Sequence, residues 1–214
     1  MTQMEWQKLS MRASEVFTPA APIDAERLFA GRIGQLRRVA DAVNQKGQHA
    51  VIFGERGVGK TSLANIISTK LNGPLLTVRV NCDSADTYST LWRKMFEQIT
   101  FAQATRSMGL GTGVNTTIRT LAEQLGDDIA PDHVRQTLAF LPGVLPILII
   151  DEFDRIADAG VRAAMADTIK TLSDHAIAAT IVLVGVADSV DELIRAIIYL
   201  TYQRTDAILE VWTT

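Results

Sequence analysis

The sequence predicts an α/β protein with a doubly wound fold, in which a central parallel sheet of about five strands carries helices on both faces. Short apolar segments alternate with segments of helical period along most of the chain, an order typical of βαβ units. The 214 residues include 47% hydrophobic and 21% charged residues, a composition that can bury one sizeable core. We therefore expect one domain over residues 31–214, preceded by an arm over residues 1–30.

The first half of the chain is expected to contain three helices and two strands. Apolar residues recur every three or four positions in the helical segments, whereas the strand segments are short apolar runs followed by a glycine or a polar residue. The arm has two prolines and no clear period, so we expect it to be extended. The expected elements are a helix over 32–46, a strand over 49–53, a helix over 60–71, a strand over 75–80 and a helix over 88–99.

The second half begins with residues 103–117, which are rich in Gly, Thr and Ser and have no apolar period. This composition predicts a loop or insertion without regular structure. The segment 144–150 is almost continuously apolar, as is typical of a strand buried on both faces of a parallel sheet. The remaining expected elements are helices over 118–125, 132–141, 161–175 and 190–202, and strands over 144–150, 180–186 and 207–212.

Composition and charge exclude several classes of protein. The longest apolar stretch, residues 138–150, contains proline and glycine and is shorter than the roughly 20 residues that cross a bilayer. The first residues lack the features of a secretory signal, so we expect a cytoplasmic protein without a membrane contact. The single cysteine, Cys82, excludes an internal disulfide and is expected to be a buried, unreactive thiol. Residues 151–214 hold 11 acidic against 5 basic residues and are a poor candidate for tight nucleic-acid binding.

The segment GERGVGKT fits the phosphate-binding motif G-x-x-x-x-G-K-[ST] and lies between a predicted strand and a predicted helix. Glycines let the backbone curl so that its N–H groups point at phosphate oxygens, and the helix N-terminus adds its positive dipole. Lys60 would reach the β- and γ-phosphates, and the Thr61 hydroxyl would ligate Mg²⁺. A chance glycine-rich turn is the alternative, but the flanking elements favour a doubly wound P-loop NTPase. The expected nucleotide-binding residues here are Gly54, Glu55, Arg56, Gly57, Val58, Gly59, Lys60, Thr61 and Ser62.

A second chemical motif, ILIIDE, ends the apolar strand predicted over 144–150. Its two carboxylates follow the strand at the edge where open α/β sheets bind ligands. Asp151 would hold Mg²⁺ through water, and Glu152 would orient and deprotonate a water for attack on the γ-phosphate. The alternative is a solvated acidic loop after a core strand. A base next to the metal ligand favours hydrolysis, so a small-molecule kinase is disfavoured.

The motifs GERGVGKT and ILIIDEFD, with FAGR at residues 29–32 starting a helix upstream of the first strand, resemble the AAA+ ATPases. The resemblance covers roughly residues 16–189. It is strongest to the origin-recognition-like branch and its bacterial relatives, which include transposition helper and STAND signalling ATPases. It implies ATP and Mg²⁺ as cofactors, self-association, and a DNA or protein partner. A slow nucleotide-gated switch of the STAND type, with little turnover, remains an alternative.

The resemblance also gives roles to residues outside the two motifs. The arm would cradle adenine, which would place Phe17, Ile23 and Phe29 near the base, although these apolar residues fit core packing equally well. Arg32, which follows the arm, is also expected to bind the nucleotide. Asn81 ends a predicted strand where the family has a polar switch that restrains the catalytic glutamate. The alternative is an asparagine that caps the turn after the strand.

Further implied residues follow the strand predicted over 180–186. Asp188 or Ser189 would sense the γ-phosphate. Arg204, with Arg195 as the second choice, would be an arginine finger that completes the site of a neighbouring molecule, or else a surface arginine.

The resemblance also predicts an insertion and a missing element. The interval between the two motifs is longer than in compact family members, so residues 103–117 are interpreted as a flexible insertion. Such a loop either contacts a partner or DNA or only connects the elements on each side. The helical lid of the family is expected to be absent or truncated, because few residues follow the last predicted strand.

Overall fold

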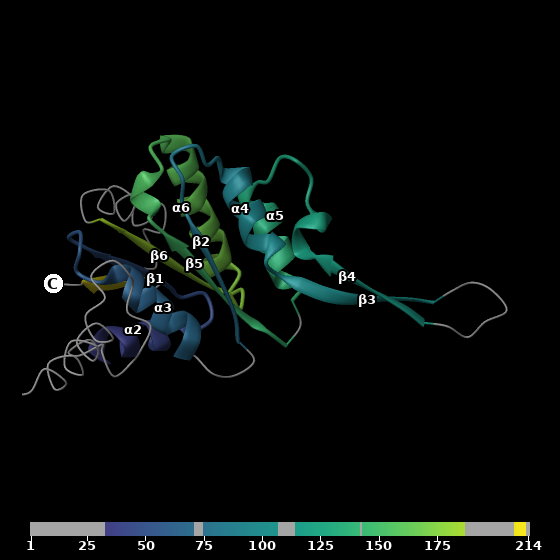
Figure 1. The fold of residues 1–214 in the computed structure, drawn as a ribbon, viewed down its shortest axis with the longest axis horizontal. Coiled ribbons are helices and arrows are strands. Elements are labelled where there is room, and N and C mark those ends of the chain that lie inside the picture. The colour runs from purple at the N-terminus through teal and green to yellow at the C-terminus, as the bar shows by residue number, and fades with distance from the viewer. Residues whose placement is uncertain (1–32, 71–74, 107–113, 142, 187–207, 213–214) are drawn as a thin grey trace, which may run out of the picture.

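A parallel sheet forms the centre of the molecule. The computed structural model of the chain describes residues 33–70, 75–106, 114–141, 143–186 and 208–212. Within these ranges, the central sheet has five parallel strands in the order β2-β5-β6-β1-β7 (Figure 1). The strands are β1 (His49–Gly54), β2 (Leu75–Asn81), β5 (Leu145–Asp151), β6 (Thr180–Val186) and β7 (Ile208–Trp212). The predicted α/β fold with a central parallel sheet is confirmed.

Helices cover both faces of the sheet. Adjacent residues of a strand point to opposite faces, so each strand contributes to two clusters. Val51 and Phe53 belong to the cluster that includes α4, α5 and α6, whereas Ala50 and Ile52 belong to the cluster with α2 and α3 (Figure 1). The helices are α2 (Ile33–Val43), α3 (Lys60–Lys70), α4 (Tyr88–Glu97), α5 (Pro131–Ala139) and α6 (Ala159–Asp174). The doubly wound arrangement is therefore confirmed.

The largest fully buried side chain is Trp92, on α4. Its ring lies 5.4 Å from that of Phe96, centroid to centroid, and Met95 beside them is also fully buried. The apolar stripe of this helix is thus part of the core, as its period predicts. Within the described ranges, no helix is both long enough and apolar enough to cross a membrane.

The segment between α4 and α5 differs from the prediction. Strands β3 (Thr100–Arg106) and β4 (Val114–Thr120) form an antiparallel hairpin that extends away from the sheet and its helices (Figure 1). The expectation of an irregular loop over 103–117 is wrong for the two strands, and so is the helix expected over 118–125. Residues 118–120 continue β4, and the chain then forms a short 3-10 helix, η2 (Leu121–Gln124). Threonine and β-branched residues favour this extended backbone over a helix.

The last predicted elements are described in part. Helix α6 begins two residues before its predicted start, because the Asp158 carboxylate accepts hydrogen bonds from the backbone N–H groups of Gly160 and Val161. Strand β7 matches the strand expected over 207–212. The helix expected over 190–202 lies outside the described residues.

A histidine is buried at the start of β1. The His49 side chain has no exposed surface, and its Nδ1 accepts a hydrogen bond of 3.0 Å from the backbone N–H of Ile181 on β6. The ring proton is therefore on Nε2, which has no hydrogen-bond partner within the described part of the chain. Burial lowers the pKa of His49 to about 4, so the ring is neutral in the folded protein at neutral pH.

We expect this histidine to make the protein less stable in acid. The unfolded chain takes up the His49 proton at its ordinary pKa of 6.5, whereas the folded protein does so only near pH 4. The contribution to stability is complete above pH 6.5 and is lost as the pH falls to 4, by about 3 kcal/mol. Urea unfolding at pH 7.5 and 4.5 would measure it.

Replacement of His49 by Asn removes the titrating group, so His49→Asn should lose much less stability between the two pH values. His175→Asn, at an exposed histidine, is the matched control and should behave like the parent. An equal pH dependence in the parent and in His49→Asn would contradict the assignment.

Candidate functional site

The glycine-rich loop lies between β1 and α3, in the strand–loop–helix context that its motif requires. Gly57 and Gly59 have φ angles of +82° and +83°, in the left-handed region that favours glycine. Helix α3 begins at Lys60, and the N–H of Leu63 donates to the Gly59 carbonyl at 3.0 Å. The loop therefore leads directly into a helix N-terminus, where backbone N–H groups can bind an anion.

The lysine of the motif lies under this loop. Its Nζ donates to the backbone carbonyls of Gly54, at 2.9 Å, and Glu55, at 2.7 Å. Thr61 follows at the first turn of α3, half-buried and lining the same cavity. Of the other loop residues, Glu55 and Arg56 are exposed, Val58 is half-buried and Ser62 is buried.

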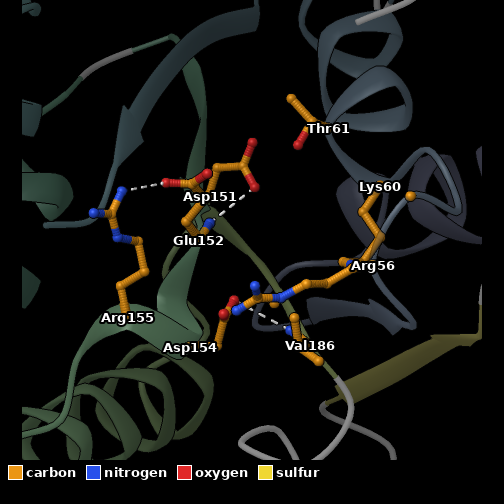
Figure 2. Close-up of a pocket in the computed structure, with 10 residues that line it drawn as sticks. Arg56, Lys60, Thr61, Asp151, Glu152, Asp154, Arg155 and Val186 are labelled. Carbon is orange, nitrogen blue, oxygen red and sulfur yellow. Dashed lines mark hydrogen bonds and ion pairs between the residues drawn. The ribbon is translucent and has the colours of Figure 1, made fainter. Parts of the chain in front are cut away.

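Asp151 ends strand β5 and is almost completely buried, at 2% exposure. Its Oδ1 accepts a hydrogen bond of 2.8 Å from the backbone N–H of Glu152. Its Oδ2 accepts one of 2.5 Å from Nη2 of Arg79 on β2. Figure 2 shows the carboxylate directed toward Thr61 across the cavity. Both oxygens are held, so the orientation of this carboxylate is fixed.

The side chain of Glu152 points away from Thr61, unlike that of Asp151. It has a left-handed backbone, with φ of 56° and ψ of 36°, and starts the short 3-10 helix η3 (Phe153–Arg155). Its half-exposed carboxylate accepts a hydrogen bond of 3.0 Å from Nη1 of Arg155, on the side away from Thr61 (Figure 2). The pair raises the pKa of Arg155. A left-handed backbone costs energy in a residue other than glycine and concentrates at functional sites.

The loop and the end of β5 face one cavity of about 520 Å³. Strand β6 lies between β5 and β1 and supplies the cavity floor through Gly185 and Val186. Asp154 joins η3 to this strand, because its Oδ1 accepts a hydrogen bond of 3.2 Å from the Val186 N–H. The charged lining residues are Arg56, Lys60, Asp151, Glu152, Asp154 and Arg155.

The sequence patterns did not predict a role for Arg79, Asp154 or Arg155, or for Asn65, whose side-chain oxygen accepts a hydrogen bond from Arg79. Arg79 is a charged residue inside an apolar strand two positions before Asn81, and this was the available signal. A strand alternates its faces, so the two residues share a face next to β5.

Asn81 itself lies beside Asp151 in the β2–β5 register, with an exposed side chain. Among the described residues, the hydrogen bond to the Glu152 carboxylate comes from Arg155 and not from Asn81. The role expected for Asn81 stays a prediction.

Other predicted residues are placed as follows. Cys82 is buried, as predicted, and burial raises the pKa of its thiol to about 12, which disfavours the nucleophilic thiolate. The remaining predicted residues lie outside the described part of the chain. They are Phe17, Ile23, Phe29, Arg32, Asp188, Ser189, Arg195 and Arg204.

The donor set fits Mg²⁺ and a phosphate-bearing ligand. The Thr61 hydroxyl and the Asp151 carboxylate are oxygen ligands of the kind that Mg²⁺ prefers. Across the described residues, no group of three or more His, Cys, Asp or Glu side chains could hold a metal ion. Mg²⁺ at nucleotide sites is commonly bound by one or two protein ligands together with phosphate oxygens.

A doubly wound parallel sheet with this loop between β1 and α3 defines a P-loop NTPase. A family model described as AAA domain matches residues 43–194, which is well over half of the chain. The chain therefore belongs to the AAA domain family, and the resemblance found in the sequence is confirmed. No curated protein sequence matches the chain significantly.

Solved structures support the same fold. A Walker-type ATPase of Pyrococcus abyssi has a TM-score of 0.56 and 15% identity, covering 91% of this chain and 56% of its own. Cdc6p of Pyrobaculum aerophilum has a TM-score of 0.52 and 14% identity over 92% of this chain and 48% of its own. Orc1 of Aeropyrum pernix, solved in complex with DNA, has a TM-score of 0.51 and 16% identity, covering 92% of this chain and 46% of its own. The chain thus spans about half the length of these proteins.

Removal of the motif lysine is the first test of this site. We expect Lys60→Ala to bind ATP about 10- to 100-fold more weakly, because a charge-assisted contact to phosphate is lost. Isothermal titration calorimetry with Mg·ATP would measure the change. Lys46→Ala, at an exposed lysine, is the matched control. Unchanged ATP affinity in Lys60→Ala would show that the loop does not bind the phosphates.

Proposed function

We propose that the chain binds and hydrolyses ATP with Mg²⁺ and couples its nucleotide state to assembly and to a DNA- or protein-handling partner. Membership of the AAA domain family supports a nucleotide-binding ATPase domain. The observation that supports hydrolysis is that Asp151 and Glu152 line the same cavity as Lys60 and Thr61, with the Asp151 carboxylate directed toward Thr61.

The glycine-rich loop would bind the phosphates, and Thr61 together with Asp151 at the end of β5 would bind the metal. Backbone N–H groups of residues 54–62 and the Lys60 ammonium would hold the phosphates. The Thr61 hydroxyl would bind Mg²⁺ directly, and Asp151 would bind it through water. The metal, when bound, would neutralise the negative charge that develops on the phosphate oxygens.

Glu152 would accept the proton of the attacking water. Its present partner, Arg155, is half-exposed like Glu152 itself, so water screens the pair and the glutamate can leave it at little cost. The carboxylate can then turn toward the cavity, where a water beside the γ-phosphate would be its hydrogen-bond partner.

Several residues keep roles that only the family resemblance supports. Phe29 would contact adenine, Arg32 would bind the nucleotide, and Asp188 would sense the γ-phosphate. Arg204 would act in the site of a neighbouring molecule, which would make self-association part of catalysis.

A DNA or protein partner is the least constrained part of the proposal. The similar Orc1 protein of Aeropyrum pernix was solved in complex with DNA, which supports testing duplex DNA first. The second candidate function is a slow nucleotide-gated switch of the STAND type. The orientation of Glu152 toward Arg155 and away from Thr61 favours a low basal rate and keeps this candidate open.

The role of Glu152 as a general base can be tested by replacing its carboxylate with an amide. We expect Glu152→Gln to bind ATP like the parent and to hydrolyse it about 10²- to 10⁴-fold more slowly, since an amide cannot accept the proton. Release of labelled phosphate from ATP and calorimetric binding would be measured together. Glu123→Gln, at an exposed glutamate on η2, is the control. Hydrolysis at the parental rate in Glu152→Gln would remove Glu152 from the mechanism.

Assembly can be tested by the dependence of the rate on protein concentration. If a neighbouring molecule completes the site, phosphate release per molecule should rise with concentration in the parent and stay low in Arg204→Ala. The series would be repeated with duplex DNA. A flat, near-zero rate despite measurable ATP binding would contradict the assembling ATPase and favour the switch.

A further inference from the structure

Asp151 already has a cation beside it. Arg79, on the neighbouring strand β2, reaches the Asp151 carboxylate with Nη2 at 2.5 Å. Its Nη1 donates to the Oδ1 of Asn65 on α3, the helix that carries Thr61. The guanidinium is thus held from two sides, and its side chain is only 23% exposed. It links the phosphate-loop helix to the end of β5.

Arg79 is the cationic partner of a carboxylate that is almost completely buried. A buried carboxylate that lost this partner would be an uncompensated charge, and such a charge attracts any available cation. Mg²⁺ and Arg79 therefore compete electrostatically for one carboxylate.

The remaining charges around the cavity are balanced without Arg79. Arg56, Lys60 and Arg155 supply the positive charges, and Glu152 and Asp154 join Asp151 as the negative ones. Three cations thus oppose three carboxylates, and Arg79 adds a fourth cation behind Asp151. A divalent cation that arrives alone meets a net positive site, whereas a metal chelated by phosphates arrives with a negative ligand.

We propose that Arg79 is the counter-cation that keeps Asp151 from binding free divalent metal, so that the site accepts the metal only as its complex with a nucleoside triphosphate. This inference rests on the proposed function of Asp151 as a metal ligand. Arg79 acts through Asp151 and does not touch the substrate. Its effect is selectivity for the metal–nucleotide complex over the metal present in solution.

The probe is Mn²⁺ alone, because the electron paramagnetic resonance signal of free Mn²⁺ reports binding without nucleotide and without turnover. The parent should bind Mn²⁺ weakly at Asp151, with no saturation below millimolar concentrations. Arg79→Gln should bind Mn²⁺ at least about tenfold more tightly, because one positive charge near the carboxylate is gone. Arg79→Lys keeps the charge and should resemble the parent.

Two further variants locate the effect. Arg79→Gln combined with Asp151→Asn should lose the gained Mn²⁺ binding. Arg119→Gln removes one positive charge at an exposed ion pair on β4 and should leave Mn²⁺ binding unchanged. Circular dichroism would verify that each variant is folded.

Two results would overturn the proposal. One is a folded Arg79→Gln that binds Mn²⁺ no more tightly than the parent. The other is a parent that binds Mn²⁺ below millimolar concentration in a manner lost in Asp151→Asn. The second result decides the question even if Arg79→Gln does not fold. A failure of the parent to bind Mg·ATP would contradict the proposed function instead, and calorimetry detects that separately.

Discussion

The burial of β1 and β5 on both faces of a parallel sheet is the constraint on which the site depends. Parallel strands need a covering layer on each face, and the two helix layers provide it. Because all strands of this sheet run in the same direction, the loop after β1 and the carboxylate at the end of β5 emerge at one edge. The shared strand direction thus brings functional groups that lie far apart in sequence to the same edge of the sheet.

The parts that the sequence predicted well are those with strong local signals. The continuous apolar run that ends in Asp151 fixed the position of β5, and the glycine motif fixed the start of α3. The cavity floor could not be predicted in the same way. It depends on β6 lying between β5 and β1, which brings Gly185 and Val186 to the site, and the sequence contains no local signal for strand order.

The hairpin was missed for a different physical reason. Most of the hairpin residues whose burial is described are exposed, so these strands lack the period-2 pattern that identifies a half-buried strand. Phe101 is packed against the main core, whereas Ile118 on the other strand is 74% exposed. The role of Arg79 could not be predicted because it depends on which strand lies beside β2. The contact between Arg79 and Asp151 follows only once β5 is known to be that neighbour.

The left-handed backbone at Glu152 separates two adjacent carboxylates into different environments. Asp151 ends the strand, is buried, and points toward the phosphate loop, whereas Glu152 is half-exposed and points toward Arg155. The same turn starts η3 and brings Asp154 to the N–H of Val186 at the end of β6. A rearrangement of this turn would therefore either move the end of β6 or break that hydrogen bond. The hydrogen bond of Asp154 thus links the turn that carries the carboxylates to the end of β6.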